Sequence, residues 1–154
     1  ILNDIRIDFE LLLAEKDATI TSDNLPVIRA NGFQINQLFS NLISNSLKFS
    51  KNKPHIHIAA EFTTASDITV SNSIDPAERF VKLTFSDNGI GFEQEFSEKI
   101  FSLFQRLHGK HEYSGTGIGL SIVKKIVEQH DGFIVAESKP GDGAVFNIWL
   151  PVLE

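Results

Sequence analysis

The sequence predicts an α+β fold: a two-layer α/β sandwich in which helices cover one face of a mixed, mostly antiparallel sheet. Residues 35–43 and 118–127 carry apolar side chains at the spacing of an amphipathic helix. Residues 55–62 and 79–87 alternate apolar with polar side chains, as half-buried strands do. The expected order is helix, strand, helix, two strands, a long polar segment, helix and two strands, which suits this architecture.

The N-terminal part is expected to contain a helix, a short strand and a second, longer helix. Apolar side chains recur at helical spacing from Leu2 to Leu12, and residues 18–23 then alternate like a strand. Asn31 is a suitable N-cap for the second helix, because its side-chain oxygen can accept a hydrogen bond from a free backbone N–H group. The KNKP sequence at residues 51–54 ends that helix.

A polar connection at residues 63–79 separates the two alternating strands. It is too long for a simple hairpin, so we expect a surface insertion there. The last helix is expected to close at Gly132, because glycine is common just past a helix C-terminus. The PGDG turn at residues 140–143 joins the two final strands, residues 132–139 and 144–151.

Length, charge and composition narrow the function classes. At 154 residues the chain is expected to be a single domain. Its net charge of −6 argues against a nucleic-acid partner, since phosphate backbones require a basic surface. The absence of cysteine excludes disulfides and cysteine-ligated zinc and is typical of a reducing cytosol. The chain also has no methionine, so we expect a piece of a longer protein, which can itself be membrane-anchored. We expect this piece to be cytoplasmic and monomeric.

Glycines alternate at positions 115, 117 and 119 and lead directly into a predicted helix. The free backbone N–H groups at such a helix start, together with the positive end of the helix dipole, suit a phosphate group. The G-x-G-x-G spacing differs from the dinucleotide fingerprint, and the Lys-Ser/Thr pair of a P-loop does not follow the last glycine. The stretch therefore predicts a nucleotide held in another kind of fold.

A polar stripe is predicted along one side of the second long helix. Asn41, Asn45 and Lys48 are separated by four and three residues, which keeps them within about 60° of arc at ~100° per residue. The stripe borders the apolar face, so these side chains are expected at the rim of a pocket. Mg²⁺ accepts an amide oxygen and takes its other ligands from water and substrate phosphates, so one asparagine is a sufficient protein ligand.

The DNGIGF sequence, residues 87–92, follows an apolar strand. A turn alone could explain Asp-Asn-Gly. Gly89 and Gly91 also allow the backbone to approach a ligand closely. Asp87 would then be a carboxylate at the floor of a pocket, where it can accept a hydrogen bond from the exocyclic amino group of adenine and reject a base that offers an oxo group.

Four motifs occur in a fixed order: NLISNSLKFS, DNGIGF, IFSLFQRL and GTGIGLSIVKKIV. They closely resemble the N box, first glycine box, F box and second glycine box of sensor histidine kinases. The resemblance is to the catalytic, ATP-binding domain of the GHKL superfamily and covers the chain from about residue 5 to residue 151. The sequence LFQRLHGKHEYSGTGIGL looks most like kinases attached to PAS or phytochrome-type sensory modules.

The resemblance implies the Bergerat fold and a site for ATP with Mg²⁺. Asn45 would ligate Mg²⁺, Asn41 would lie near the phosphates, and Lys48 would contact a phosphate. Phe49 stands where the family has an aromatic residue beside the adenine. Asp87 would bind the adenine amino group.

The resemblance also implies that residues 93–114 form a mobile ATP lid. Phe101 and Phe104 would anchor this segment, and Arg106 could approach the terminal phosphate. The remaining expected ATP contacts come from both glycine boxes: Gly89 and Gly91 at the adenine floor, and Gly115, Thr116, Gly117, Gly119 and Leu120 over the triphosphate.

The position four residues before Asn45 separates the enzyme types of the superfamily. Its chaperone, gyrase and mismatch-repair ATPases carry a water-activating glutamate there, whereas this chain has Asn41, whose amide cannot take a proton at neutral pH. The resemblance therefore implies transfer of the γ-phosphoryl group to a histidine on a separate dimerisation and phosphoacceptor domain, with a response regulator downstream. A GHKL ATPase, an anti-sigma-type serine kinase and a non-catalytic nucleotide-gated scaffold are the alternatives.

Overall fold

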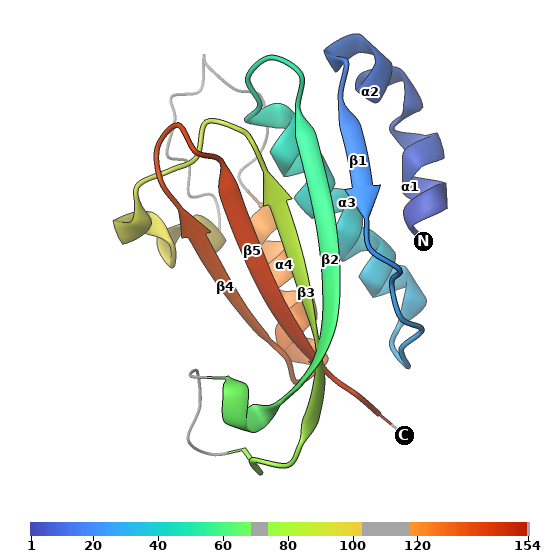
Figure 1. Ribbon diagram of the computed structural model, residues 1–154, viewed down its shortest axis with the longest axis vertical. Helices are drawn as coiled ribbons and strands as arrows, with labels where there is room; N and C mark the ends of the chain where they lie inside the picture. The colour runs from blue at the N-terminus through green and yellow to red at the C-terminus, as the bar shows by residue number, and fades with distance from the viewer. Residues whose placement is uncertain (69–73, 103–117, 154) are drawn as a thin grey trace.

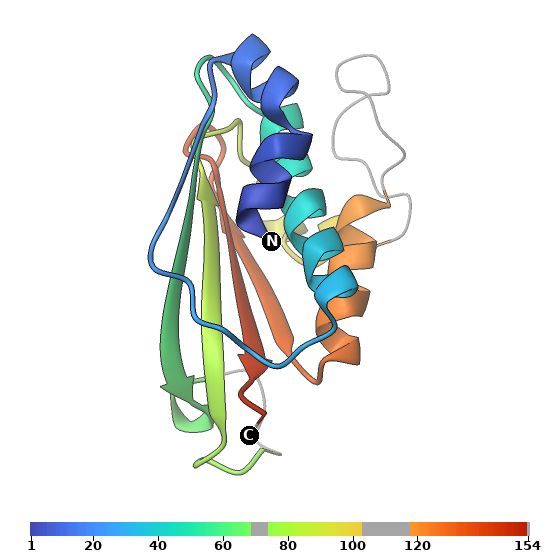
Figure 2. The same cartoon turned by 90° about the vertical axis from the view of Figure 1, so that its right-hand side faces the viewer.

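A computed structural model describes residues 1–68, 74–102 and 118–153 of the chain (Figure 1). It has two layers, a five-stranded sheet and a set of helices that lie on one face of that sheet (Figure 2). The predicted α+β sandwich is therefore confirmed. No helix in these described ranges is long and apolar enough to cross a membrane.

The sheet has the strand order β1-β2-β3-β5-β4. The strands are β1 (Thr19–Ser22), β2 (His55–Thr64), β3 (Arg79–Asp87), β4 (Phe133–Ser138) and β5 (Ala144–Pro151). β1 and β2 are parallel, and the other neighbouring pairs are antiparallel, so the sheet is mixed and mostly antiparallel as predicted. β3 is the central strand. The last residues of β3 pair directly with residues of both neighbouring strands, β2 and β5.

The helices are α1 (Leu2–Asp8), α2 (Glu10–Lys16), α3 (Gly32–Lys48) and α4 (Gly119–Gln129). The single helix expected over the first residues is wrong at Phe9, where φ is −98° and ψ is 8° and the chain passes from α1 to α2. Phe9 packs against the core at this break. No glycine or proline marks the position, so the sequence carried no signal for it.

The core lies between the helices and the sheet. The Asn31 side chain caps α3 by accepting a hydrogen bond from Gln34 N at 3.1 Å, as predicted. α3 and α4 then bury their apolar stripes against β2, β3 and β5, and side chains such as Leu42 and Val127 are at most 1% exposed. Burial of each such side chain contributes roughly 1.5–3 kcal/mol.

Two expectations at the chain's turns need correction. α4 ends at Gln129, and the residue with left-handed backbone after it is Asp131, with φ of 56°, instead of Gly132. Gly132 is required for a different reason, because a Cβ there would clash with the carbonyl oxygen of Trp149. In addition, β2 continues to Thr64, which pairs with Arg79, so the connection that was expected at residues 63–79 is shorter.

The connection between β2 and β3 begins with a short 3-10 helix, η1 (Ala65–Asp67). Ile68 follows it and is only 6% exposed. Phe80, near the start of β3, is 1% exposed yet lies outside the main core cluster, and its ring centroid is 6.0 Å from that of Phe133. Phe80 and Phe133 therefore form an apolar contact apart from the main core.

Candidate functional site

Asp87 is the last residue of β3, and three hydrogen-bond donors hold its carboxylate. Oδ1 accepts from the backbone N–H groups of Gly89 (2.9 Å) and Ala144 (3.1 Å). Oδ2 accepts from the Ser46 hydroxyl at 2.7 Å. The donors come from the loop after β3, from β5 and from α3. The carboxylate is thus a half-buried acceptor with a fixed orientation at the end of the central strand.

The glycines of the DNGIGF sequence lie where backbones meet. A Cβ on Gly89 would lie 2.6 Å from the carbonyl oxygen of Phe49, which already accepts from Ile90 N at 3.0 Å. Gly91 has φ of 67°, and a Cβ there would clash with the carbonyl oxygen of Lys139. The two glycines therefore let the end of α3 and the β4–β5 turn close around Asp87. Their contact with a base stays a prediction.

Sequence reasoning missed the residues that hold these loops together. Gly143 has φ of 80°, and a Cβ there would clash with the carbonyl oxygen of Asp87. Ser138 Oγ accepts from Phe92 N at 2.9 Å and donates to Gly143 O at 2.6 Å. The PGDG pattern predicts only a turn, and nothing in the sequence links Ser138 to the loop after β3.

Gln94 adds a second set of contacts at the edge strand β4. Its Oε1 accepts from Ser138 N at 2.9 Å, and its Nε2 donates to Ala136 O at 3.3 Å. The side-chain amide therefore pairs with the free edge of β4 much as a neighbouring strand would. This pairing ties the start of the expected lid, residues 93–102 in the described range, to the sheet.

The polar stripe of α3 lies beside this carboxylate. Asn41, Asn45 and Lys48 are all half-buried, at the border between the core and solvent, as their spacing predicts. Lys48 Nζ lies 5.0 Å from the ring centroid of Phe49, the C-cap residue of α3. Ser46, which holds Asp87, is the residue next to Asn45. One turn of α3 thus carries both the proposed metal ligand and a donor to the carboxylate.

The start of α4 lies next to Asn41 of the polar stripe. A Cβ on Gly119, the first residue of α4, would lie 3.5 Å from Asn41 Oδ1. Leu120 follows and packs partly buried against the core. The last glycine of the second glycine box is therefore next to the N box, as an ATP site would need. Gly115, Thr116 and Gly117 lie outside the described residues.

The part of the expected lid that the structure describes is packed on the body of the domain. It contains two short 3-10 helices, η2 (Gln94–Phe96) and η3 (Lys99–Phe101). Phe101 is 8% exposed, and its ring meets that of Phe146 edge-on at a centroid distance of 6.2 Å. Phe101 is thus packed on the domain, and its role as an anchor of a lid stays a prediction. Phe104 and Arg106 lie outside the described residues.

The residues present fit a hard cation that is held mainly by its nucleotide. Within residues 1–68, 74–102 and 118–153, no three His, Cys, Asp or Glu side chains gather to hold a metal ion. The amide oxygen of Asn45 is a ligand that Mg²⁺ accepts when phosphates and water supply the others. The donor set therefore suits Mg²⁺ brought with a triphosphate and does not suit a zinc site.

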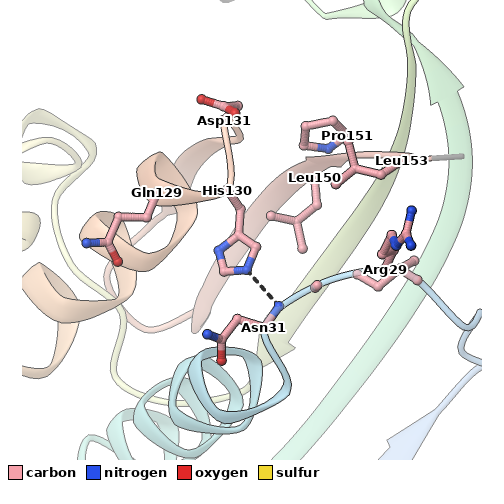
Figure 3. A pocket seen from close by; sticks show the side chains of 10 residues that line it. Arg29, Asn31, Gln129, His130, Asp131, Leu150, Pro151 and Leu153 are labelled. Atoms are coloured by element: carbon pink, nitrogen blue, oxygen red, sulfur yellow. Dashed lines mark hydrogen bonds between the residues drawn. The ribbon is translucent and has the colours of Figure 1, made fainter.

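A separate hollow of about 310 Å³ lies at the other end of the helices, between the N-terminus of α3 and the C-terminus of α4 (Figure 3). Its wall includes Arg29, Asn31, His130 and Leu150, and none of the predicted site residues lines it. Across it, Asn31 N donates to His130 Nε2 at 3.2 Å, which links the cap of α3 to the end of α4 (Figure 3).

The comparisons with known proteins agree with this geometry. Residues 30–154 match the family described as histidine kinase-, DNA gyrase B- and HSP90-like ATPase. Cyanobacterial phytochrome A of Nostoc sp. (strain PCC 7120) is 45% identical over 141 residues, which make up 91% of this chain and 17% of that phytochrome. The chain therefore spans less than a fifth of this relative, and the relative fits the resemblance to phytochrome-type kinases.

Solved structures show the same fold. The catalytic domain of histidine kinase ThkA has a TM-score of 0.72 and 26% identity, covering 97% of this chain and 90% of that one. A structure of ThkA in complex with the response regulator protein TrrA has a TM-score of 0.70 and 24% identity, covering 99% and 39%. Full-length ShkA in complex with AMPPNP has a TM-score of 0.75 and 22% identity, covering 99% and 30%.

The family match covers most of the chain, and the N box and both glycine boxes converge, in the described residues, on one end of a fold shared with histidine kinase catalytic domains. The chain belongs to the histidine kinase-, DNA gyrase B- and HSP90-like ATPase family.

Proposed function

We propose that the chain binds ATP with Mg²⁺ and donates the γ-phosphoryl group to a histidine on a separate dimerisation and phosphoacceptor domain of the same protein. One observation carries this proposal most directly. The Asp87 carboxylate is held by three donors at the end of β3, beside the polar stripe of α3. A fixed acceptor there can bind the amino group of adenine while the stripe binds phosphates.

The phosphate end of the site is built from α3 and the second glycine box. Asn45 would supply the protein ligand to Mg²⁺, and Asn41 and Lys48 would contact phosphate oxygens. Phe49 would lie beside the adenine. Gly119 and Leu120 at the start of α4, together with Gly115, Thr116, Gly117 and Arg106, would close over the triphosphate.

The residues present favour transfer over hydrolysis. Asn41 stands where the ATPases of the superfamily carry a water-activating glutamate, and an amide cannot act as a base at neutral pH. The Mg²⁺ ion would neutralise charge on the triphosphate. Lys48 and Arg106 would add cationic contacts, and binding would place the γ-phosphoryl group in line with an incoming nucleophile. A histidine imidazole is a better nucleophile than water and needs no such base.

The partners of the whole protein follow from the same proposal. ThkA has been crystallised with a response regulator, and this chain shares its fold. We expect the parent protein to pass its phosphoryl group to a response regulator of its own. We also expect the domain itself to be monomeric and cytoplasmic, where ATP and response regulators are available.

The base-recognition part of the proposal is tested by calorimetric titration of the chain with Mg·ATP and with Mg·GTP. ATP should bind at least about tenfold more tightly, because the 6-oxo group of guanine meets an acceptor at Asp87. Equal affinities would remove Asp87 from the base site. Absence of binding to both nucleotides would favour a structural role for all four motifs.

A further inference from the structure

We propose that Ser46 determines base specificity by positioning the Asp87 carboxylate so that a single acceptor position is left for the exocyclic amino group of the base. This inference rests on the proposed ATP site. Ser46 Oγ donates a hydrogen bond of 2.7 Å to Asp87 Oδ2. Ser46 is only 7% exposed and is one of two buried polar residues among the described ones.

The lone pairs of the carboxylate can be counted. A carboxylate has about four acceptor positions, two on each oxygen. Gly89 N and Ala144 N occupy both positions of Oδ1, and the Ser46 hydroxyl occupies one position of Oδ2. One position remains, on Oδ2 beside Ser46. A single N–H donor from a ligand can therefore complete the set.

The Ser46 hydroxyl also limits what a ligand can offer. Its one proton is committed to Asp87, because a carboxylate can only accept. Neither Asp87 nor Ser46 then presents a donor to a base, and a 6-oxo group at this place would face acceptors alone. A base with a 6-amino group supplies the missing donor, so the pair Ser46 and Asp87 selects amino over oxo.

Ser46 also fixes the plane of the carboxylate. The two backbone donors fix the position of Oδ1 but do not fix the position of Oδ2. The bond to α3 ties Oδ2 to the helix that carries Asn45, the proposed metal ligand. Base recognition and phosphate recognition are thus set from neighbouring residues of one helix turn.

The experiment compares two ligands that differ in one group. Mg·ATP and Mg·purine riboside triphosphate, which has hydrogen in place of the 6-amino group, are titrated into the wild-type chain and the Ser46→Ala and Ser46→Thr variants. The wild-type chain should prefer ATP. Ser46→Ala should lower that preference at least about fivefold, because Asp87 Oδ2 loses the donor that orients it toward the 6-amino group, which only ATP carries. Ser46→Thr keeps the hydroxyl and should retain more of the preference.

Ser44→Ala is the matched control, since Ser44 lies on the same helix but is exposed, and it should leave the preference unchanged. If Ser46→Ala weakened both ligands in parallel with an unchanged preference, Ser46 would be a packing residue and the inference would be wrong. A Thr variant as unselective as the Ala variant would also contradict it. A wild-type chain with no preference would instead overturn the proposed role of Asp87.

Discussion

At the scale of single residues, the proposed function depends on the Asp87 carboxylate, whose hydrogen bonds can be named atom by atom. Asp87 Oδ1 is saturated by two backbone N–H groups, and Oδ2 is shared between Ser46 and an open position. Such a group binds hydrogen-bond donors and disfavours a ligand that presents only acceptors. A change of one atom in this side chain should therefore change which base the site prefers.

Asp87→Asn makes that change. Its carbonyl oxygen can keep both backbone donors, which places the amide NH₂ where Oδ2 was, and this NH₂ then faces the base as a donor. ATP affinity should fall at least about 30-fold, roughly 2 kcal/mol, and the affinity for inosine triphosphate relative to ATP should rise. Competition binding measures both. An unchanged preference for ATP over inosine triphosphate would show that Asp87 does not contact the base.

Asn45→Ala tests the phosphate end independently of the base. The proposed metal touches only phosphate oxygens, so the variant should weaken Mg·ATP at least about tenfold and leave adenosine binding nearly unchanged. Calorimetry with both ligands gives the comparison. A parallel loss of adenosine and Mg·ATP affinity would mean that Asn45 supports the fold instead of the metal.

At the scale of elements, the edge strand β4 is connected to the loop after β3 by the side chain of Gln94. Gln94→Ala should speed hydrogen exchange of the Ser138 amide roughly fivefold, because that N–H loses its acceptor at about 1 kcal/mol of net hydrogen-bond energy. Glu95→Ala, at the exposed neighbouring residue, is the control. Unchanged exchange at Ser138 would show that another group protects this edge.

The apolar stripe of α3 can be tested with the same substitution in two environments. Leu42 is 1% exposed in the core, whereas Leu11 on α2 is 81% exposed. Leu42→Ala should lower the free energy of unfolding by about 2–5 kcal/mol. Leu11→Ala should change it by at most about 0.5 kcal/mol. Urea denaturation compares them, and similar losses at both positions would contradict the assignment of the core.

The sequence predicted the helices and strands that depend on residues close to one another along the chain. The period of the apolar residues located α3 and α4, and the N-cap at Asn31 forms the expected bond to Gln34 N. It did not predict the break at Phe9, because Phe9 continues the helical pattern. It also did not predict the contact between Ser46 and Asp87, since partners 41 residues apart meet only through the fold.

At the scale of the whole molecule, the candidate site is confined to one end of the two layers. The end of β3, the C-terminal half of α3 and the start of α4 lie in the upper half of Figure 1. The opposite end of the helices is joined by the bond between Asn31 and His130 (Figure 3).

The central claim is that the chain is the donor half of a phosphoryl transfer and lacks the acceptor. The measurement is an incubation of three samples with γ-labelled ATP. The first contains the chain alone, and the second contains the chain with the dimerising helical domain of its parent. The third contains the chain with a variant of that domain in which the acceptor histidine is replaced. We predict label on the helical domain only, dependent on its histidine, as an acid-labile and base-stable phosphoramidate. Rapid ATP hydrolysis by the chain alone, or label on a serine, would contradict the account and favour an ATPase or a serine kinase of the same superfamily.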